Sequence, residues 1–600
     1  SRSPTVQECL FPSWAKPFIL SLAFILARIA RMEIPDNHRT RWVILPPLTP
    51  LARQNLSAFP PILRQILYNR GFATDAEARA YLRAEVLFDT SPWLLTGMEA
   101  AVKRLEQALE AREGIVVYGD YDVDGVTATA ILTDVLRRLG GRVRPYIPNR
   151  FEEGYGLNAE ALETLASEGA QLVVSVDCGI RSYLEARRAR ALGLDLIITD
   201  HHEPSSLIPE AFAVINPKQP GDRYPEKDLA GVGIAYKLVQ ALSERFAGRF
   251  EPDEYLDLVA LGTVADLAPL VGENRSLVRR GLQQLAQTRW QGLFSLANLA
   301  GISLKNVTAT HIAFMLGPRL NAAGRLESAL DALHLLLTQD VFQAGQLAQK
   351  LEIQNRERQA LTRKIQQEAE QLALAEEPDA PLLFAVHPEF NAGVVGLAAA
   401  RLVEMYYRPA VIGQRGEKTT RCSCRSIPEF NITAALDRCA DLLMQHGGHA
   451  AAAGFTVRND NLDALSVRLK TIAREQLAGL DLRPTLTADM EVQLADLHPD
   501  LLKYLRYLQP TGYGNPEAVF VTRGVQVKAV RVVGSENKHL KLVVSDGRLT
   551  FDAIGFRLGH LADRLAGQVD ILYTFELNEY NGRSSLQLNL KDVKPSGLPD

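Results

Sequence analysis

The strongest constraint on the fold is an alternation of short apolar runs and helical patterns between residues 114 and 200. The runs 114–119 (GIVVYG), 171–177 (QLVVSVD) and 194–200 (LDLIITD) are rich in Val, Ile and Leu. Strands that are apolar on both faces are typical of a parallel sheet covered by helices on either side. The segment therefore predicts a doubly wound α/β domain. A fourth strand is expected at 142–148, with helices at 126–140, 158–169 and 181–193.

The rest of the chain predicts further units of different character. Helical patterns dominate from about 229 to 334, and residues 338–376 are expected to form one long polar helix that links two domains. A second α/β unit is expected to contain a strand at 381–390, a helix at 395–406 and a strand at 408–413. The last eighty residues contain short strands separated by Gly, Asn and Asp, which indicates a small all-β barrel of the OB kind.

Six hundred residues are too many for one hydrophobic core, so we expect a multidomain protein. The predicted boundaries are an extension over 1–50, a helical lead-in over 51–110, the first α/β domain over 111–336, the linker helix over 337–377, the second α/β domain over 378–475, and the OB-like domain with its connecting segment over 476–600. Before Met32, the extension is expected to be disordered or artificial. Its apolar stretch Pro17–Ala27 is too short to cross a bilayer, and an additional buried helix is the alternative interpretation.

The cysteine content favours a cytoplasmic protein. Five cysteines at irregular spacing do not resemble a disulfide framework, which points to a reducing compartment. Cys422 and Cys424 lack the second pair of ligands that a zinc site needs. The net charge of −4 gives no sign of a nucleic-acid-binding protein, although a local basic groove is compatible with a nearly neutral total. Composition therefore leaves the function to be inferred from motifs.

Three acids follow the first apolar run at every second position. Asp120, Asp122 and Asp124 come directly after residues 114–119. If the strand continued through them, their side chains would share one face and repel one another. Such an arrangement has no ready structural purpose, so we expect a positively charged ligand there.

The other two apolar runs also end in polar residues. Asp177 ends one run, and Asp200, His201 and His202 end the other. Because the carboxyl ends of parallel strands meet at one edge of a sheet, these side chains are expected to gather there. A single Asp after a strand is usually a cap or a turn residue, but several together need cations. Carboxylates with imidazole suit Mn²⁺ or Mg²⁺, and a pair of such ions about 3.5–4 Å apart hydrolyses phosphoesters.

These motifs resemble a known superfamily. YGDYDVDG (118–125), SVDCG (175–179), TDHH (199–202) and ALGTVADL (260–267) match, in order, the motifs of the DHH phosphoesterases. Five further stretches extend the match: PNRFEEGYGLN (148–158), GPRLNAAGR (317–325), CRSIPEFN (424–431), GGHAAAAGF (447–455) and PTGYGNPEAVF (510–520). Over residues 40–600 the chain resembles the bacterial RecJ family of single-strand-specific exonucleases. The resemblance implies a DHH domain, a DHHA1-like domain and an OB-like barrel.

The resemblance also implies roles for individual residues. The implied metal ligands are Asp122, Asp124, Asp177, His201 and Asp266. Asp120 and Asp200 are expected to support them, with Asp200 hydrogen-bonded to an imidazole. His202 is expected to take part in catalysis by orienting His201 or contacting a phosphate. The sequence offers no separate general base, so water activated by the two metals is the expected nucleophile.

A second group of residues is implied to bind the substrate. Its members are Arg150, Arg325, Ser423, Arg425, Gly447, Gly448 and His449. Arginine pairs with phosphate through two hydrogen bonds and keeps its charge, and Ser423 with Arg425 resembles the family's pocket for a terminal phosphate. Apart from the resemblance, the stretch 447–455 favours a tight turn before a helix of small residues. One departure is Asn391, because relatives often have His there.

The function that the resemblance implies is a two-metal exonuclease that degrades single-stranded DNA from 5′ to 3′ in DNA repair and recombination. The expected partners are single-stranded DNA, a helicase and a single-strand-binding protein, and the chain is expected to act as a monomer without a membrane. Basic residues of the OB-like region, such as Lys528 and Arg531, suit phosphate contacts. One alternative is a phosphoesterase for short oligonucleotides, for which a 600-residue chain with a barrel is large. Another is a non-catalytic replication scaffold, which would not need the metal ligands.

Overall fold

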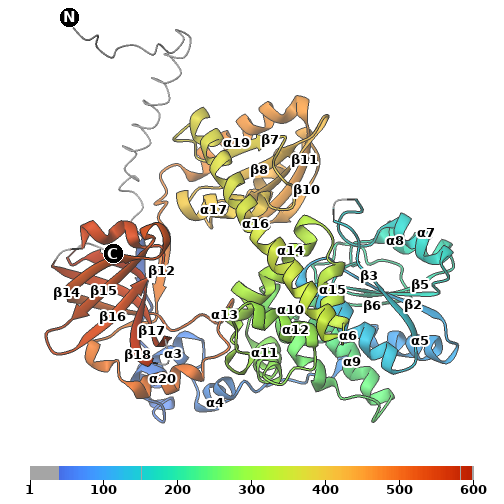
Figure 1. Ribbon diagram of the computed structural model, residues 1–600, viewed down its shortest axis with the longest axis horizontal. Coiled ribbons are helices and arrows are strands. Elements are labelled where there is room, and N and C mark those ends of the chain that lie inside the picture. Colours follow the sequence, from blue (N-terminus) through green and yellow to red (C-terminus); the bar gives the residue numbers. More distant parts are fainter. Residues whose placement is uncertain (1–39, 151, 566, 581–582, 598–600) are drawn as a thin grey trace, which may run out of the picture.

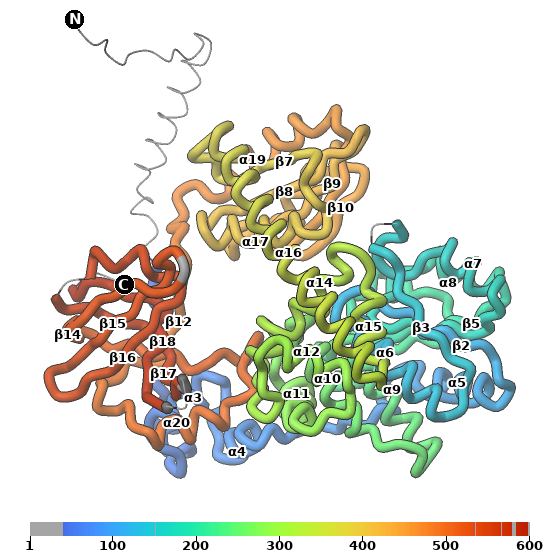
Figure 2. Tube along the Cα trace, viewed as in Figure 1, coloured from blue at the N-terminus to red at the C-terminus, as the bar shows by residue number. Residues whose placement is uncertain are grey.

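The computed structural model describes residues 40–150, 152–565, 567–580 and 583–597. Pro17–Ala27 and Met32, on which the expectations about the extension rest, lie outside these residues. Figure 1 shows three units: a barrel in red, a second α/β unit in yellow and orange, and a large α/β unit in blue and green. The chain trace in Figure 2 shows the same arrangement, with each unit built mainly from one part of the sequence.

The large α/β unit is built on a five-stranded parallel sheet. Its strands are β2 (Gly114–Gly119), β3 (Arg142–Tyr146), β4 (Leu172–Val176), β5 (Asp195–Thr199) and β6 (Ala213–Ile215), in the order β3-β2-β4-β5-β6. Alternate residues of one strand enter different cores: Val117 packs with helices α5 (Met98–Glu110), α6 (Val123–Arg138) and α9 (Gly231–Arg245), while Val116 packs with α7 (Ala159–Ser167) and α8 (Tyr183–Ala191). Helices thus cover both faces, and the predicted doubly wound sheet is confirmed.

A group of helices completes this unit beside the carboxyl edge of the sheet. They are α10 (Leu256–Ala265), α11 (Gly272–Leu285), α12 (Gln291–Leu299), α13 (Ala309–His311), the π-helix Ile312–Leu316, α14 (Gly317–Leu326) and α15 (Leu330–Leu337). The long helix α16 (Val341–Glu376) then leaves the unit. Leu351 of α16 lies in the core of the large unit, and Ile365 lies in a core of the second α/β unit. One helix therefore joins both units, as the polar pattern predicted.

The second α/β unit contains a mixed sheet of order β10-β11-β9-β8-β7. Its elements are β7 (Leu383–His387), α17 (Val395–Tyr406), β8 (Ala410–Arg415), β9 (Thr419–Arg425), α18 (Ile432–Asp437), β10 (Leu443–His449), β11 (Ala452–Arg458) and α19 (Leu462–Leu477). The Gly- and Ala-rich stretch forms the β10–β11 hairpin, so the expectation of a helix of small residues is wrong there. Pairing of β11 with β9 on its other side explains the difference, because small residues suit close strands as well as helices.

The C-terminal unit is a closed barrel. Five strands, β14 (Phe520–Val533), β15 (His539–Ser545), β16 (Thr550–Gly555), β18 (Arg583–Pro595) and β17 (Gln568–Tyr580), follow one another in that order, and β14 also pairs with β17. Phe551, Tyr573 and Phe575 fill its interior, whereas Phe556 is exposed. The predicted OB-like barrel is confirmed. The short strand β13 (Met490–Glu491) and helix α20 (Pro499–Arg506) precede it.

Segments from the start of the chain belong to the barrel unit. Strand β1 (Arg41–Ile44) pairs in parallel with β12 (Thr485–Ala488), and the Trp42 indole donates a hydrogen bond of 2.8 Å to Asp592. Helices α2 (Pro50–Asn55), α3 (Pro61–Asn69) and α4 (Asp75–Arg83) follow, and Leu63 and Tyr81 lie in the barrel's core. Residues 40–50, which the boundaries placed in an extension, are thus folded. The partners of Arg41 and Trp42 lie more than 400 residues away, so local sequence patterns give no sign of this pairing.

Among the residues that the structure describes, no helix is both long enough and apolar enough to cross a membrane.

The buried indole yields a stability prediction. Replacing a buried Trp with Ala costs about 3–5 kcal/mol through lost burial and a cavity, and Trp42→Ala also leaves Asp592 without one of its donors. We expect the barrel unit to unfold at a clearly lower temperature in a calorimetric scan. Leu51→Ala, at an exposed position in α2, serves as the control and should change the transition little. An unchanged transition in Trp42→Ala would show that β1 does not support the barrel.

Candidate metal centre and phosphate pocket

The first acidic motif lies in a loop and a helix start. Strand β2 ends at Gly119, and Asp122 is the N-cap of α6, where its Oδ1 accepts hydrogen bonds from the N–H groups of Asp124 (2.9 Å) and Gly125 (3.1 Å). The strand therefore stops before the three acids, which do not share one strand face. Gly125 permits the tight path, because a Cβ there would lie 2.6 Å from the backbone nitrogen of Asp120. The acids approach each other through this turn.

Asp124 is held by the N-terminus of another helix. Its Oδ2 accepts the N–H of Gly231 (2.6 Å) and its Oδ1 accepts the N–H of Val232 (2.8 Å), both in the first turn of α9. The positive end of a helix dipole favours a carboxylate at this place. Burial, and then the charge of Asp122, nevertheless raise the pKa of Asp124 to about 7. The α9 N–H groups thus hold the Asp124 carboxylate in a place where burial and a neighbouring negative charge oppose its ionisation.

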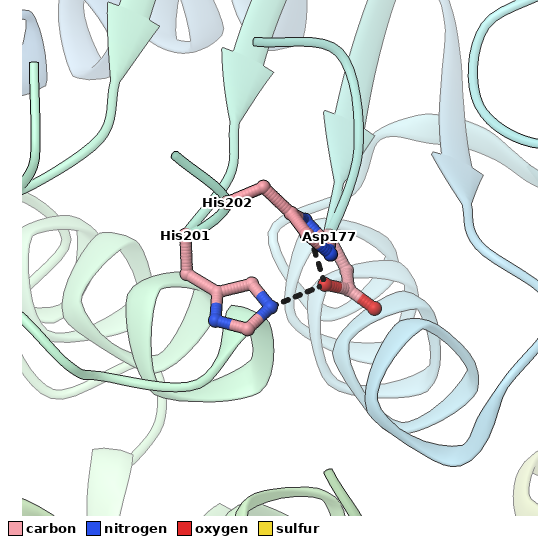
Figure 3. A group of neighbouring side chains, drawn as sticks. All are labelled: Asp177, His201 and His202. Atoms are coloured by element: carbon pink, nitrogen blue, oxygen red, sulfur yellow. Dashed lines mark ion pairs between the residues drawn. The ribbon is translucent and has the colours of Figure 1, made fainter. Parts of the chain in front are cut away.

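Asp177 and Asp200 follow the neighbouring strands β4 and β5. Asp177 has a positive φ of 60°, and its Oδ1 lies 3.1 Å from Nε2 of His201 (Figure 3). Asp200 accepts the N–H groups of His201 (2.7 Å) and His202 (3.1 Å), and its Oδ1 lies 2.8 Å from Nδ1 of His202. Burial alone would raise the pKa of Asp200, but the hydrogen bonds from His202 and Ile180 lower it overall. Asp200 therefore contacts the His202 ring and the backbone of His201, which is compatible with the supporting role expected of it.

His201 is a neutral ring that faces three acids. Burial, and then the neighbouring His202, lower its pKa to about 3. Its Nε2 lies 3.1 Å from Asp177, 3.8 Å from Asp124 and 3.9 Å from Asp266, measured to the nearest carboxylate oxygens. Asp266 reaches this place from the C-cap of α10. A neutral imidazole surrounded by carboxylates is a donor set that suits Mn²⁺ or Mg²⁺.

The cluster carries more negative charge than it can hold alone. Burial, and then the charges of neighbouring acids, raise the pKa of Asp120 and of Asp177 well above their usual range and the pKa of Asp266 to about 9. Among the described residues, Oδ1 of Asp120, Oδ1 of Asp177 and Nε2 of His201 are buried without a hydrogen-bond partner, although the last two lie 3.1 Å apart. Unpaired buried acceptors of this kind fit a cation, which would relieve the repulsion.

In the part of the chain that the structure describes, three overlapping sets of side chains bring ligand atoms within 4.8 Å of one another. They are Asp177 with His201 and His202, Asp124 with His201 and Asp266, and Asp120 with Asp122 and Asp177. Asp177 and His201 each belong to two sets, an arrangement that suits neighbouring cations sharing ligands. His202 and Asp120, expected to support the ligands, also lie where they could bind a metal.

Arginines gather beside the acidic cluster. The guanidinium of Arg150 lies 4.9 Å from the centre of the Tyr121 ring. Burial, and then the charges of Arg150 and Arg358, lower the pKa of Arg325 to about 10. Arg358 comes from the middle of α16, and within the described part of the chain its buried Nε has no hydrogen-bond partner. Sequence reasoning missed Arg358, because on a long polar helix it resembles any solvated residue.

Ser423 and Arg425 lie against the start of α17. Nη1 of Arg425 lies 3.2 Å from Oγ of Ser423, and both residues are on β9. Gly396 lies in the first turn of α17, and a Cβ there would lie 2.8 Å from Oγ of Ser423 and 3.1 Å from Nη2 of Arg425. A helix N-terminus, a hydroxyl and a guanidinium around one space are suited to bind a phosphate.

The remaining predicted substrate residues are less closely tied to this pocket. Gly447 has open space where a Cβ would be, whereas Gly448 has a φ of 146° and is needed by the hairpin, since a Cβ would clash with Ala452. His449 is exposed at the end of β10. Asn391 shapes a turn by accepting the N–H of Gly393 (2.8 Å), and Gly393 accepts a hydrogen bond from Arg325 (3.2 Å). Asn391 therefore positions Arg325 indirectly.

A doubly wound sheet with a cluster of Asp and His at its carboxyl edge, followed by a second α/β unit, defines the DHH class of phosphoesterases. Family models agree: the DHH family, N-terminal domain, matches residues 114–263, the DHHA1 domain matches 379–475, and the RecJ OB domain matches 488–592. The single-stranded-DNA-specific exonuclease RecJ of Bacillus subtilis is 38% identical over 540 residues, which cover 89% of this chain and 68% of that protein. The chain belongs to the RecJ family.

Two further comparisons show how far the likeness extends. The single-stranded-DNA-specific exonuclease RecJ of Escherichia coli is 34% identical over 89% of this chain and 96% of its own length. The crystal structure of RecJ in complex with Mn²⁺ from Thermus thermophilus matches with a TM-score of 0.81 and 32% identity, over 93% of this chain and 80% of that one. The likeness thus spans all three units.

Gly231 yields a prediction about the metal centre. A Cβ at Gly231 would lie 2.7 Å from Cβ and 2.8 Å from Oδ1 of Asp177, whereas a Cβ at Gly233 would meet only Leu229 at an ordinary 3.5 Å. Gly231→Ala must therefore displace Asp177, and we expect Mn²⁺ binding to weaken by about tenfold, equivalent to 1.4 kcal/mol. Gly233→Ala, in the same helix, should bind Mn²⁺ normally. Calorimetric titration measures both, and equal affinities would contradict the placement of Asp177 at the metal.

Proposed function

We propose that this protein is an exonuclease that hydrolyses single-stranded DNA from its 5′ end with two divalent cations, Mn²⁺ or Mg²⁺. The observation that carries the proposal is the convergence of unpaired buried acceptors from Asp120, Asp177 and His201 beside a pocket built for phosphate. Relatives in the same family are named as single-stranded-DNA-specific exonucleases. The 5′ polarity follows from the family resemblance.

One group of side chains would bind the cations, and a second group holds those side chains in place. Asp122, Asp124, Asp177, His201 and Asp266 would hold the cations, with His202 and Asp120 within reach. The bound ions would supply an activated water and stabilise the charge on the oxygens of the phosphodiester. The protein keeps Asp124 in place through α9 and both histidines in place through Asp200. His201 remains neutral at physiological pH, because its pKa is lowered to about 3 by burial, so its lone pair stays available.

The arginines would place the strand. Arg425, Ser423 and the start of α17 would hold the terminal phosphate, while Arg150 and Arg325 would neutralise the phosphates next to it. Gly447 leaves room for the strand to approach β10, with His449 as a donor. A strand anchored by its end presents a phosphodiester a fixed distance inward to the metals. This geometry would produce stepwise cleavage from one end.

The predicted domains would share this work. We propose that residues 111–336 carry the hydrolysis, residues 378–475 the terminal pocket and residues 476–600 the grip on the strand. In DNA repair and recombination, a helicase and a single-strand-binding protein would supply unwound DNA to a cytoplasmic monomer. A phosphoesterase for short oligonucleotides would gain little from the barrel, and a non-catalytic scaffold would not need the complete ligand set.

Asp177 tests the hydrolysis directly. Asp177→Ala removes an acid from two of the three ligand sets, so we expect the rate on single-stranded DNA to fall about a thousandfold or more, or about 4 kcal/mol of transition-state stabilisation. Mn²⁺ should raise the melting temperature of the original protein but not of the variant, since only bound ligand stabilises. Asp500→Ala, an exposed acid of α20, is the control. Near-normal turnover of the variant at saturating Mn²⁺ would remove Asp177 from the site.

Arg425 tests the terminal pocket. Arg425→Ala removes a charge-assisted contact, so the preference for a 5′-phosphate over a 5′-hydroxyl end should shrink about tenfold, while Mn²⁺ still binds. Competition between the two labelled substrates measures this ratio. Arg458→Ala, at the exposed end of β11, should keep it. An unchanged ratio in Arg425→Ala would place the terminal phosphate elsewhere.

A further inference from the structure

The motif PTGYGNPEAVF has no role in the site described above, yet it forms a rigid turn. The N–H of Gly512 donates to the carbonyl of Asn515 (2.8 Å), and the N–H of Asn515 donates back to Gly512 (3.1 Å). The buried Asn515 side chain donates to the carbonyls of Leu508 (3.0 Å) and Pro510 (2.7 Å) and accepts from the hydroxyl of Tyr81 (2.8 Å). The turn therefore has one conformation, with Tyr513 at its tip.

This turn is docked on the segment that follows Asp266. The N–H of Leu270 donates to the carbonyl of Tyr513 (2.7 Å). A Cβ at Gly512 would lie 2.8 Å from Leu270, and a Cβ at Gly514, whose φ is 74°, would lie 2.9 Å from Pro269. Leu270 lies four positions after Asp266, a distance of at most about 14 Å along the chain. The glycines of the motif thus allow a part of the barrel unit to sit beside the metal centre.

Two apolar side chains are exposed at this contact. The Tyr513 side chain is 67% exposed, although the backbone around it is tightly held. Leu267, directly after Asp266, is 65% exposed and has a φ of 61°, which is a strained conformation for Leu. Strained backbone of this kind clusters at functional sites and ligand clamps, and Leu267 directly follows a predicted metal ligand. An aromatic ring on a rigid support is the usual platform for a nucleobase.

We propose that Tyr513 stacks on a base of the DNA strand, with Leu267 as a second apolar contact, on the side of the metal centre away from the terminal-phosphate pocket. The inference rests on the proposed function and adds a positioning residue to it. The arginines interact with Asp120 and Asp122, which belong to one ligand set, whereas Asp266 belongs to another. The turn is docked on the segment that follows Asp266, so we place the stacked base on that side of the metal centre.

Stacking on Tyr513 should make binding depend on one particular base of the strand. Removing one stacked base by mutation of its aromatic partner weakens single-strand binding by about 5- to 100-fold. A duplex cannot offer an unpaired base to the ring, so the contact also favours single strands. Tyr513→Ala should raise KM for a single strand about tenfold and leave kcat nearly unchanged, because the acids and arginines remain. Tyr513→Phe keeps the ring and should behave like the original protein.

The test uses the full-length protein and single strands that lack one base at successive positions from the 5′ end. The original protein should show a KM about tenfold higher when one particular base, inward of the cleaved bond, is missing. Tyr513→Ala should lose that sensitivity and keep normal Mn²⁺ binding. Phe342→Ala, which removes an exposed aromatic at the start of α16, should keep the original profile.

Two results would overturn the inference: an unchanged profile in Tyr513→Ala, or an equal loss at every position together with weaker Mn²⁺ binding, which would make the turn structural. If the original protein does not cleave single strands with Mn²⁺, the proposed function fails. Fluorescence anisotropy of the same strands in the absence of cleavage would still test the base contact, since Tyr513→Ala should bind the complete strand about tenfold more weakly.

Discussion

Mutual repulsion among the buried acids at the carboxyl edge of the first sheet is the constraint on which the rest of the structure depends. Left alone, Asp120, Asp177 and Asp266 would take up protons, as their raised pKa values show. The fold opposes this with the N-terminus of α9 at Asp124 and the N-cap of α6 at Asp122. Oδ1 of Asp120, Oδ1 of Asp177 and Nε2 of His201 still have no hydrogen-bond partner among the described residues. The free energy that binds cations is therefore already present in the folded chain, because binding relieves the repulsion.

The proposed site also depends on contacts that hold the three units together. The acids lie in one unit and Ser423 and Arg425, proposed to bind the terminal phosphate, in another, and α16 contributes to the cores of both. The barrel unit is tied to the first unit by Arg275 of α11, whose guanidinium donates to the carbonyls of Tyr507, Leu508 and Gln509 and to that of Tyr81. Four carbonyls around one buried guanidinium form a strong anchor, since an unpaired carbonyl there would be costly. This anchor fixes the turn that carries Tyr513 beside Asp266.

Much of the fold could be predicted because its signals are local. Strands β2, β4 and β5 are continuous apolar runs, and their order places Asp177 and His201 at one edge. The strand alternation of Asp120, Asp122 and Asp124 misled, because an N-cap and a helix turn produce the same spacing without a strand. Trp42, Gly231 and Arg358 could not be found, since their partners are remote in sequence and their residue types are common elsewhere. The Ala-rich stretch after His449 was ambiguous for the same reason: its neighbours in the sheet decide its structure.

The central claim is that the acidic cluster, once filled with Mn²⁺ or Mg²⁺, cleaves single-stranded DNA from its 5′ end. Digestion of single strands and duplexes labelled at either the 5′ or the 3′ end, with and without these ions, tests it most directly. The account predicts that a 5′ label is released at once as a mononucleotide from the single strand, that a 3′ label stays on a product that shortens gradually, and that chelation or a duplex stops the reaction. Early release of the 3′ label, or cleavage that continues without divalent ions, would contradict it.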